Sequence, residues 1–149
     1  MSNEMYIKQI SVFLENKEGT LAELLNTLGD AEVNLLALCL ADTADFGIAR
    51  IITASADVEK ALSILREAGF MASKCDLVCV QLPHEPKGLA HVAQVLGDGG
   101  VSLEYAYSFC QSTLDDAVII IRPSDNEKCI EILKANGVTI VTQQQVDKF

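Results

Sequence analysis

Polar and charged side chains capable of binding a small charged molecule gather between residues 15 and 21, read as Glu15-Asn16-Lys17-Glu18-Gly19-Thr20-Leu21. Gly19 removes a side chain where the backbone turns, and the apolar spacing that follows predicts a helix. A helix N-terminus presents unpaired N–H groups and partial positive charge, which favours a carboxylate. The Asn16 amide oxygen can accept a hydrogen bond from an ammonium group. The turn therefore suits a ligand that carries both charges.

A second amide, Asn34, begins the next predicted strand and can contribute to the same head group. Together these residue types suit a free amino acid. Structural interpretations stand beside this one. Thr20 fits a helix cap, Asn34 fits a helix-to-strand turn, and Asn16 fits an ordinary loop residue.

Signals for catalysis and metal binding are missing from the sequence motifs. No G-x-S-x-G, H-E-x-x-H or Walker loop occurs. Two histidines without a Cys/His cluster predict no zinc site. We therefore expect no catalytic residue, no metal and no cofactor.

The composition limits the partners. The chain has 149 residues with a formal net charge of -10, which disfavours nucleic acid and anionic membrane surfaces. Five cysteines without a C-x-x-C pair indicate free thiols in a reducing compartment. The N-terminus lacks a signal peptide and no apolar run reaches transmembrane length. We expect a cytoplasmic protein that contacts neither nucleic acid nor membrane.

The elements that position the turn occur twice. Residues 12–74 align without a gap onto residues 80–142, and Leu28-Gly29-Asp30 recurs as Leu96-Gly97-Asp98. This repeat predicts two units, residues 1–75 and residues 76–149. Only Asp76 separates the last strand of one from the first strand of the other, so no flexible linker joins them.

Hydrophobic periodicity predicts the order β-α-β-β-α-β in each unit. The first-unit elements are a strand through 10–14, a helix over 21–28, strands over 33–41 and 48–53, a helix over 58–65 and a strand over 70–75. The second-unit elements are 77–82, 89–96, 101–109, 117–121, a helix after 124, and 138–143. Capping boxes are expected at Thr20 with Glu23 and at Ser124 with Glu127. The fold class is α+β: two ferredoxin-like units side by side, antiparallel sheets with helices on one face.

The chain resembles a tandem pair of ACT domains, a family of amino-acid-binding regulatory modules. The resemblance rests on residues 10–23 (ISVFLENKEGTLAE) with Val33-Asn34-Leu35, and on residues 82–92 (LPHEPKGLAHV) with Val101-Ser102-Leu103. In the family, effectors bind where this loop meets a neighbouring ACT domain. The resemblance implies these first-unit ligand residues: Asn16, Gly19, Thr20, Leu21, Asn34 and Leu35, with Lys17 and Glu18 from the same loop.

The second unit departs from the family pattern. Asn16 corresponds to His84 and Asn34 to Ser102, and the loop glycine comes one position later. The resemblance implies these residues: His84, Glu85, Gly88, Leu89 and Ser102. We therefore expect two sites that are not equivalent.

Three features extend the prediction. The apolar strand 33–41 should be a sheet edge that pairs with the matching strand 101–109 or with a second chain, giving a homodimer. The alternative is a strand that packs under a helix. Arg50 should lie on the open sheet face, ion-paired or against a ligand carboxylate. Tyr105, Tyr107 and Phe109 should share one face, as a pocket wall or as core.

These observations favour a stand-alone regulatory protein that senses a free amino acid at ACT–ACT interfaces. The alternative is a regulatory subunit of a separate amino-acid-metabolising enzyme. A third hypothesis is a small enzyme with Glu104, Tyr105, Tyr107 and His84 as candidates, since fold does not determine function.

Overall fold

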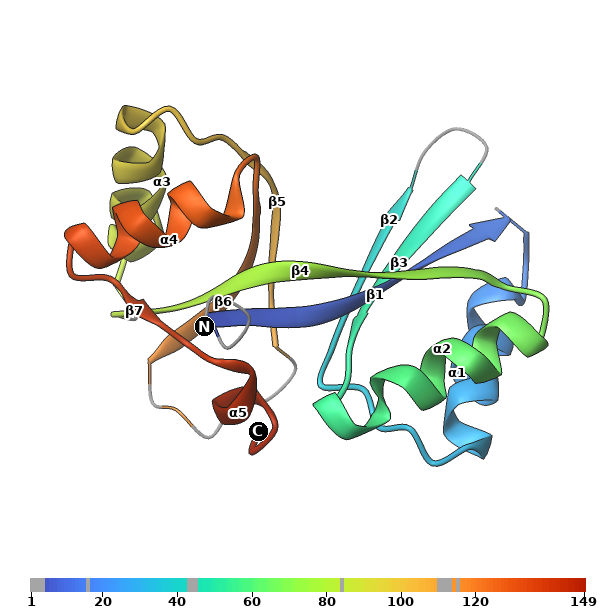
Figure 1. The fold of residues 1–149 in the computed structure, drawn as a ribbon. Helices are drawn as coiled ribbons and strands as arrows, with labels where there is room; N and C mark the ends of the chain where they lie inside the picture. The colour runs from blue at the N-terminus through green and yellow to red at the C-terminus, as the bar shows by residue number, and fades with distance from the viewer. Residues whose placement is uncertain (1–4, 16, 43–45, 84, 110–113, 115) are drawn as a thin grey trace. The chain divides into compact units, whose positions relative to one another are not determined.

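The computed structural model describes residues 5–15, 17–42, 46–83, 85–109, 114 and 116–149 (Figure 1). The chain forms two compact units. The first unit is Lys8–Cys75, and the second unit is Asp76–Phe149 together with the N-terminal residues up to Ile7. Within the described residues, no helix is long and apolar enough to cross a membrane.

The first unit has the predicted order of elements. They are β1 (Tyr6–Glu15), α1 (Thr20–Asp30), β2 (Ala37–Asp42), β3 (Phe46–Ile52), a 3-10 turn (Ser55–Asp57), α2 (Val58–Glu67) and the start of β4 (Met71–Leu82). The strands follow the order β2-β3-β1-β4. Alternate residues of β1, such as Val12 and Leu14, pack with Leu24 of α1 and Leu62 of α2 in one core. Both helices therefore cover one face of the sheet.

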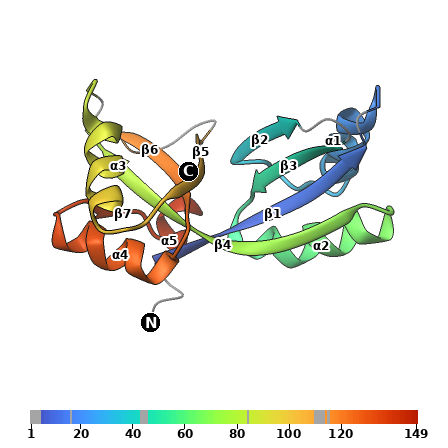
Figure 2. The ribbon, with the colours of Figure 1, turned by 90° about the horizontal axis from the view of Figure 1, so that it is seen from above.

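The second unit repeats this plan. Its elements are the end of β4, α3 (Gly88–Asp98), β5 (Leu103–Ser108), β6 (Ala117–Pro123), α4 (Asn126–Ala135), β7 (Thr139–Ile140) and α5 (Gln143–Val146). Here β5 pairs with β6, β6 with β4, and β4 with β7. Helices α3 and α4 lie beside each other in both views (Figures 1 and 2). The α+β, ferredoxin-like prediction is confirmed.

Several predicted boundaries are wrong. The strand expected over 33–41 begins only at Ala37, because the chain takes a turn after α1. The strand expected over 138–143 is two residues long, and a helix follows it. The two strands expected on either side of Asp76 form the single strand β4, which supplies residues to both units.

Neither predicted capping box forms. Gly19 caps α1, and the Thr20 hydroxyl instead donates a hydrogen bond to the carbonyl oxygen of Lys17 at 3.1 Å. Asp125 caps α4 by accepting from the Lys128 N–H at 3.1 Å. Among the helices that the structure describes, a capping box joins Thr142 and Gln145 at the start of α5.

The third strand is offset between the repeats. Ile10 of β1 pairs with Ile51, whereas its counterpart Val78 of β4 pairs with Ile121. Ile121 lies 70 residues after Ile51, not the 68 of the gapless alignment. The connection from β6 to α4 is shorter than that from β3 to α2, because it lacks the 3-10 turn, and α4 therefore returns to the 68-residue spacing. Because two residues are one period of a strand, the inward face is preserved.

Strands β2 and β5 are each outermost in their own unit and pair with β3 and β6. Pairing of the β2 edge with a further strand stays a prediction. Arg50 pairs across the sheet with Ser11 and Cys39, while the flanking Ala49 and Ile51 belong to the helix-covered core. Arg50 therefore lies on the open sheet face.

Candidate functional site

The turn between β1 and α1 of the first unit is stabilised by its own backbone. Gly19 has a φ of 83°, a left-handed conformation that disfavours a side chain. The Lys17 N–H donates to the Glu15 carbonyl oxygen at 2.8 Å, and the Glu23 N–H donates to the Gly19 carbonyl oxygen at 2.9 Å. This geometry fixes where α1 begins.

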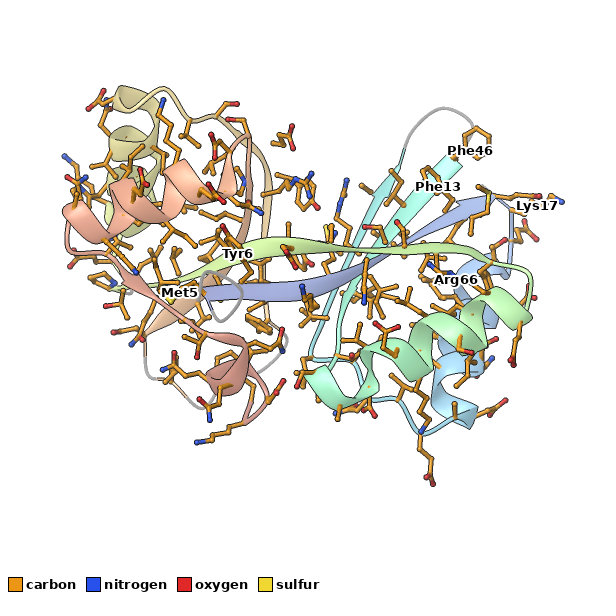
Figure 3. All side chains as sticks on the ribbon, in the orientation of Figure 1. Met5, Tyr6, Phe13, Lys17, Phe46 and Arg66 are labelled. Atoms are coloured by element: carbon orange, nitrogen blue, oxygen red, sulfur yellow. The ribbon has the colours of Figure 1, made fainter. Side chains whose placement is uncertain are left out.

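Two charged side chains meet on this turn. Lys17 Nζ lies 2.6 Å from Glu15 Oε2, and both side chains are exposed. The hydrogen bond and the charge of Lys17 lower the pKa of the Glu15 carboxyl, and Glu15 raises the pKa of Lys17 in the same way. Both groups therefore stay charged at neutral pH. Figure 3 shows Lys17 at the same end of the unit as Phe13 and Phe46.

A cavity lies on each side of the turn. The α2-side cavity, of about 420 Å³, is lined by Phe13, Leu14, Glu15, Lys17, Thr20, Glu23, Phe46 and residues 68–71. The β2-side cavity, of about 240 Å³, is lined by Leu14, Glu15, Lys17, Thr20, Leu21, Leu40, Ala41 and Gly47. The two cavities share Leu14, Glu15, Lys17 and Thr20, and the last three supply the polar groups that face both of them.

The predicted first-unit residues divide into two groups. Lys17, Thr20 and Leu21 line cavities, and the exposed Glu18 and Gly19 form the tip of the turn. Asn34 and Leu35 lie beyond the far end of α1, an 11-residue helix about 16 Å long. The unit therefore does not bring Asn34 to its own turn. Asn16 lies outside the described residues.

The second unit has a cavity of about 320 Å³ at the corresponding turn. Its lining is Gln81, Leu82, Pro83, Gly88, His91, Val92, Asp116 and residues 136–139. Of the predicted second-unit residues, Gly88 lines it. Glu85 lies in the turn, where its N–H donates to Pro83 and its carbonyl accepts from Gly88. Leu89 is exposed, and the Ser102 N–H donates a hydrogen bond to Ser124 Oγ at 3.1 Å. His84 lies outside the described residues.

The sequence interpretation missed the walls contributed by distant segments. Phe70 and Met71 follow α2, some fifty residues after the turn, and line the α2-side cavity. Residues 136–139 line the second-unit cavity in the same way, together with the exposed His91 of α3. The available signal was topological, since β4 lies next to β1 in this fold and starts where β1 ends.

Two ferredoxin-like units in one chain, each hollowed at the turn before its first helix, define a tandem α+β protein. More particularly, the chain belongs to the ACT domain pair family, whose model matches residues 5–149.

Two solved structures are similar to the chain. The chain is 41% identical to a protein from Bacteroides thetaiotaomicron, covering 99% of both chains with a TM-score of 0.88. The regulatory subunit of aspartate kinase from Thermus thermophilus, in its ligand-free form, is 14% identical, with a TM-score of 0.64 over 88% of this chain and 90% of that one. At this identity the likeness shows the fold alone. No curated protein sequence matches.

Proposed function

We propose that this protein is a stand-alone regulatory protein that binds a free amino acid at the turn between β1 and α1 of the first unit. The carrying observation is that two cavities flank one turn and share an oppositely charged pair, Lys17 and Glu15. A zwitterion can interact with both members of that pair. Family membership supports the proposal, because ACT domains bind their amino-acid effectors at this loop.

The proposed role is binding rather than catalysis. In the described residues, the cavities hold no nucleophile placed beside a base. Ligand binding would shift an existing equilibrium between packing states, and a second copy of the chain, joined in a homodimer, would supply the neighbouring ACT domain. The outermost strand β2 (Ala37–Asp42), with one charged residue, offers an edge for that contact.

Thermal denaturation with each of the twenty amino acids at millimolar concentration tests the proposal. A ligand present at 100 times its Kd adds roughly 2.7 kcal/mol to the free energy of unfolding and raises the Tm. Lys17→Gln should weaken any such effect, because both cavities lose their ammonium group. Lys60→Gln is the matched control, since Lys60 is exposed on α2 of the same unit and lines neither cavity.

No stabilisation by any amino acid would contradict the proposal, as would equal effects of the two lysine variants.

A second candidate is a regulatory subunit of a separate amino-acid-metabolising enzyme. The structural likeness to the aspartate kinase regulatory subunit of Thermus thermophilus favours it. Affinity purification from the native cell, followed by mass spectrometry, separates the two. A stoichiometric enzyme partner supports the subunit function, and a lone homodimer supports the stand-alone sensor.

A further inference from the structure

The α2-side cavity and the second-unit cavity occupy equivalent places in the two repeats. Most of their lining positions are related by the 68-residue repeat, among them Glu15 with Pro83, Thr20 with Gly88 and Gly69 with Gly137. A hollow between the first turn and the start of the last strand is therefore a feature of both units. What differs is the chemistry of the walls.

The first-unit wall is apolar and aromatic. Phe13 and Phe46 come from neighbouring strands: Phe46 pairs with Glu15, so its side chain lies on the same sheet face as those of Glu15 and Phe13. Phe13 and Phe46 are about half exposed, at 51% and 53%, and Met71, which lines the same cavity, is 72% exposed. Large apolar side chains exposed together mark a surface that another molecule covers.

The second-unit wall is polar at the same places. Gln81 takes the position of Phe13, and the β6 register puts Asp116 in the position of Phe46. These two side chains satisfy each other, with Gln81 Nε2 donating to Asp116 Oδ2 at 3.0 Å. Thr139 replaces Met71. An apolar ligand side chain would exclude water from this pair and offer no hydrogen bonds in its place, so its binding there would cost free energy.

The charged residues that line the two equivalent cavities also differ. The α2-side cavity is lined by Glu15, Lys17 and Glu23, so both signs stand beside the apolar wall. The second-unit cavity has Pro83 and His91 in place of Glu15 and Glu23. A volume of about 420 Å³ is within the range of small-molecule pockets. Apolar walls with a mixed-charge rim match an amino acid with a large apolar side chain.

We infer that the α2-side cavity of the first unit selects an amino acid with a large apolar side chain, and that the equivalent second-unit cavity does not bind this class. The inference rests on the proposed function and adds which side of the turn is used and for which ligand class. The side chain of the ligand lies against Phe13, Phe46 and Met71, while its head group lies at Lys17 and Glu15.

Isothermal titration with the full-length protein tests the inference, using L-phenylalanine, L-leucine and L-methionine against L-serine and L-asparagine. Two variants, Phe13→Gln and Met71→Thr, convert first-unit positions to their second-unit counterparts. Each should weaken binding of the apolar probes about tenfold, since part of an apolar contact is lost. Leu40→Ala is the matched control: Leu40 is 51% exposed, like Phe13, but lines the β2-side cavity.

The outcomes are separable. Apolar probes that bind, lose affinity in Phe13→Gln and Met71→Thr, and keep it in Leu40→Ala support the inference. Loss only in Leu40→Ala, or tighter binding of serine or asparagine, overturns the inference while amino-acid binding itself stands. NMR locates the bound probe: changes in amide chemical shifts at residues 81–83 and 136–139 rather than at residues 68–71 also overturn the inference. Failure of every amino acid to bind overturns the proposed function as well.

Discussion

The guanidinium of Arg66 donates two hydrogen bonds to the carbonyl oxygen of Ala72, from Nε at 3.1 Å and from Nη2 at 3.0 Å. Arg66 lies in the last turn of α2 and Ala72 near the start of β4. The pair therefore closes the loop formed by residues 68–71, which is a wall of the α2-side cavity. A residue that lines neither first-unit cavity thus holds one side of the candidate site.

Arg66→Met should loosen this wall while keeping the apolar stem of the side chain. We expect the free energy of unfolding to fall by about 1 kcal/mol, because two exposed hydrogen bonds are lost. Amide hydrogen exchange of residues 69–72 should accelerate. Lys60→Met, an exposed substitution on the same helix, is the control, and equal exchange in the two variants would show that the Arg66 contact does not hold the loop.

Tyr6 links the first residues of the chain to the second unit. It is 7% exposed and packs with Val78, Val80 and Ile130 in the second-unit core (Figure 3). Tyr6→Ala should lower the free energy of unfolding by about 3 kcal/mol, as large-to-small core substitutions do. Urea denaturation measures the loss, and hydrogen exchange should locate it in α4. Tyr6→Phe keeps the ring and should cost far less; a comparable loss would refute packing as the cause.

Two glycines of α3 should respond oppositely to alanine. A Cβ on Gly88 would lie 2.5 Å from the Pro83 carbonyl oxygen, whereas a Cβ on Gly97 meets no heavy atom within 4 Å. Gly88→Ala should therefore destabilise by about 1–3 kcal/mol through the forced backbone shift. Gly97→Ala should stabilise by up to about 1 kcal/mol through helix propensity. Thermal denaturation of both variants checks the signs, and a stable Gly88→Ala would mean that the turn relaxes freely.

Alkaline pH should destabilise the protein through its buried thiols. Burial, and then the negative charge of Asp125, raises the pKa of Cys129 from 9.0 to about 12. Burial also raises the pKa of Cys79. Above pH 9 the unfolded chain releases these protons while the folded protein retains them, so the stability present below pH 9 is lost as the pH rises toward the folded value.

Titration of the Cys129 thiol alone should lower the free energy of unfolding by about 1–2 kcal/mol between pH 8 and pH 10.5. Urea denaturation at both pH values measures it in the wild type and in Cys129→Ala. The variant starts from a lower free energy of unfolding but should lose less of it with pH. Parallel losses in the two proteins would rule out a contribution from Cys129.

Much of the fold was readable from neighbouring residues. The apolar spacing of Leu21, Leu24 and Leu28 predicted α1, and the recurrence of Leu-Gly-Asp predicted the tandem arrangement. These signals are local, because helix and strand periodicities extend over only a few residues. The family resemblance likewise rested on contiguous motifs, and the match over residues 5–149 confirms it.

The tertiary structure decided which distant residues meet. Phe70 and Met71 line a cavity with Phe13 because the chain reverses after α2 and β4 lies beside β1. Asp116 replaces Phe46, rather than aligning with Ile48, because strand register depends on pairing partners and connection lengths that a gapless alignment ignores. Tyr6 joins the second-unit core for a related reason. Burial of apolar surface stabilises a side chain in whichever core it reaches, and the repeat boundary in the sequence does not determine which core that is.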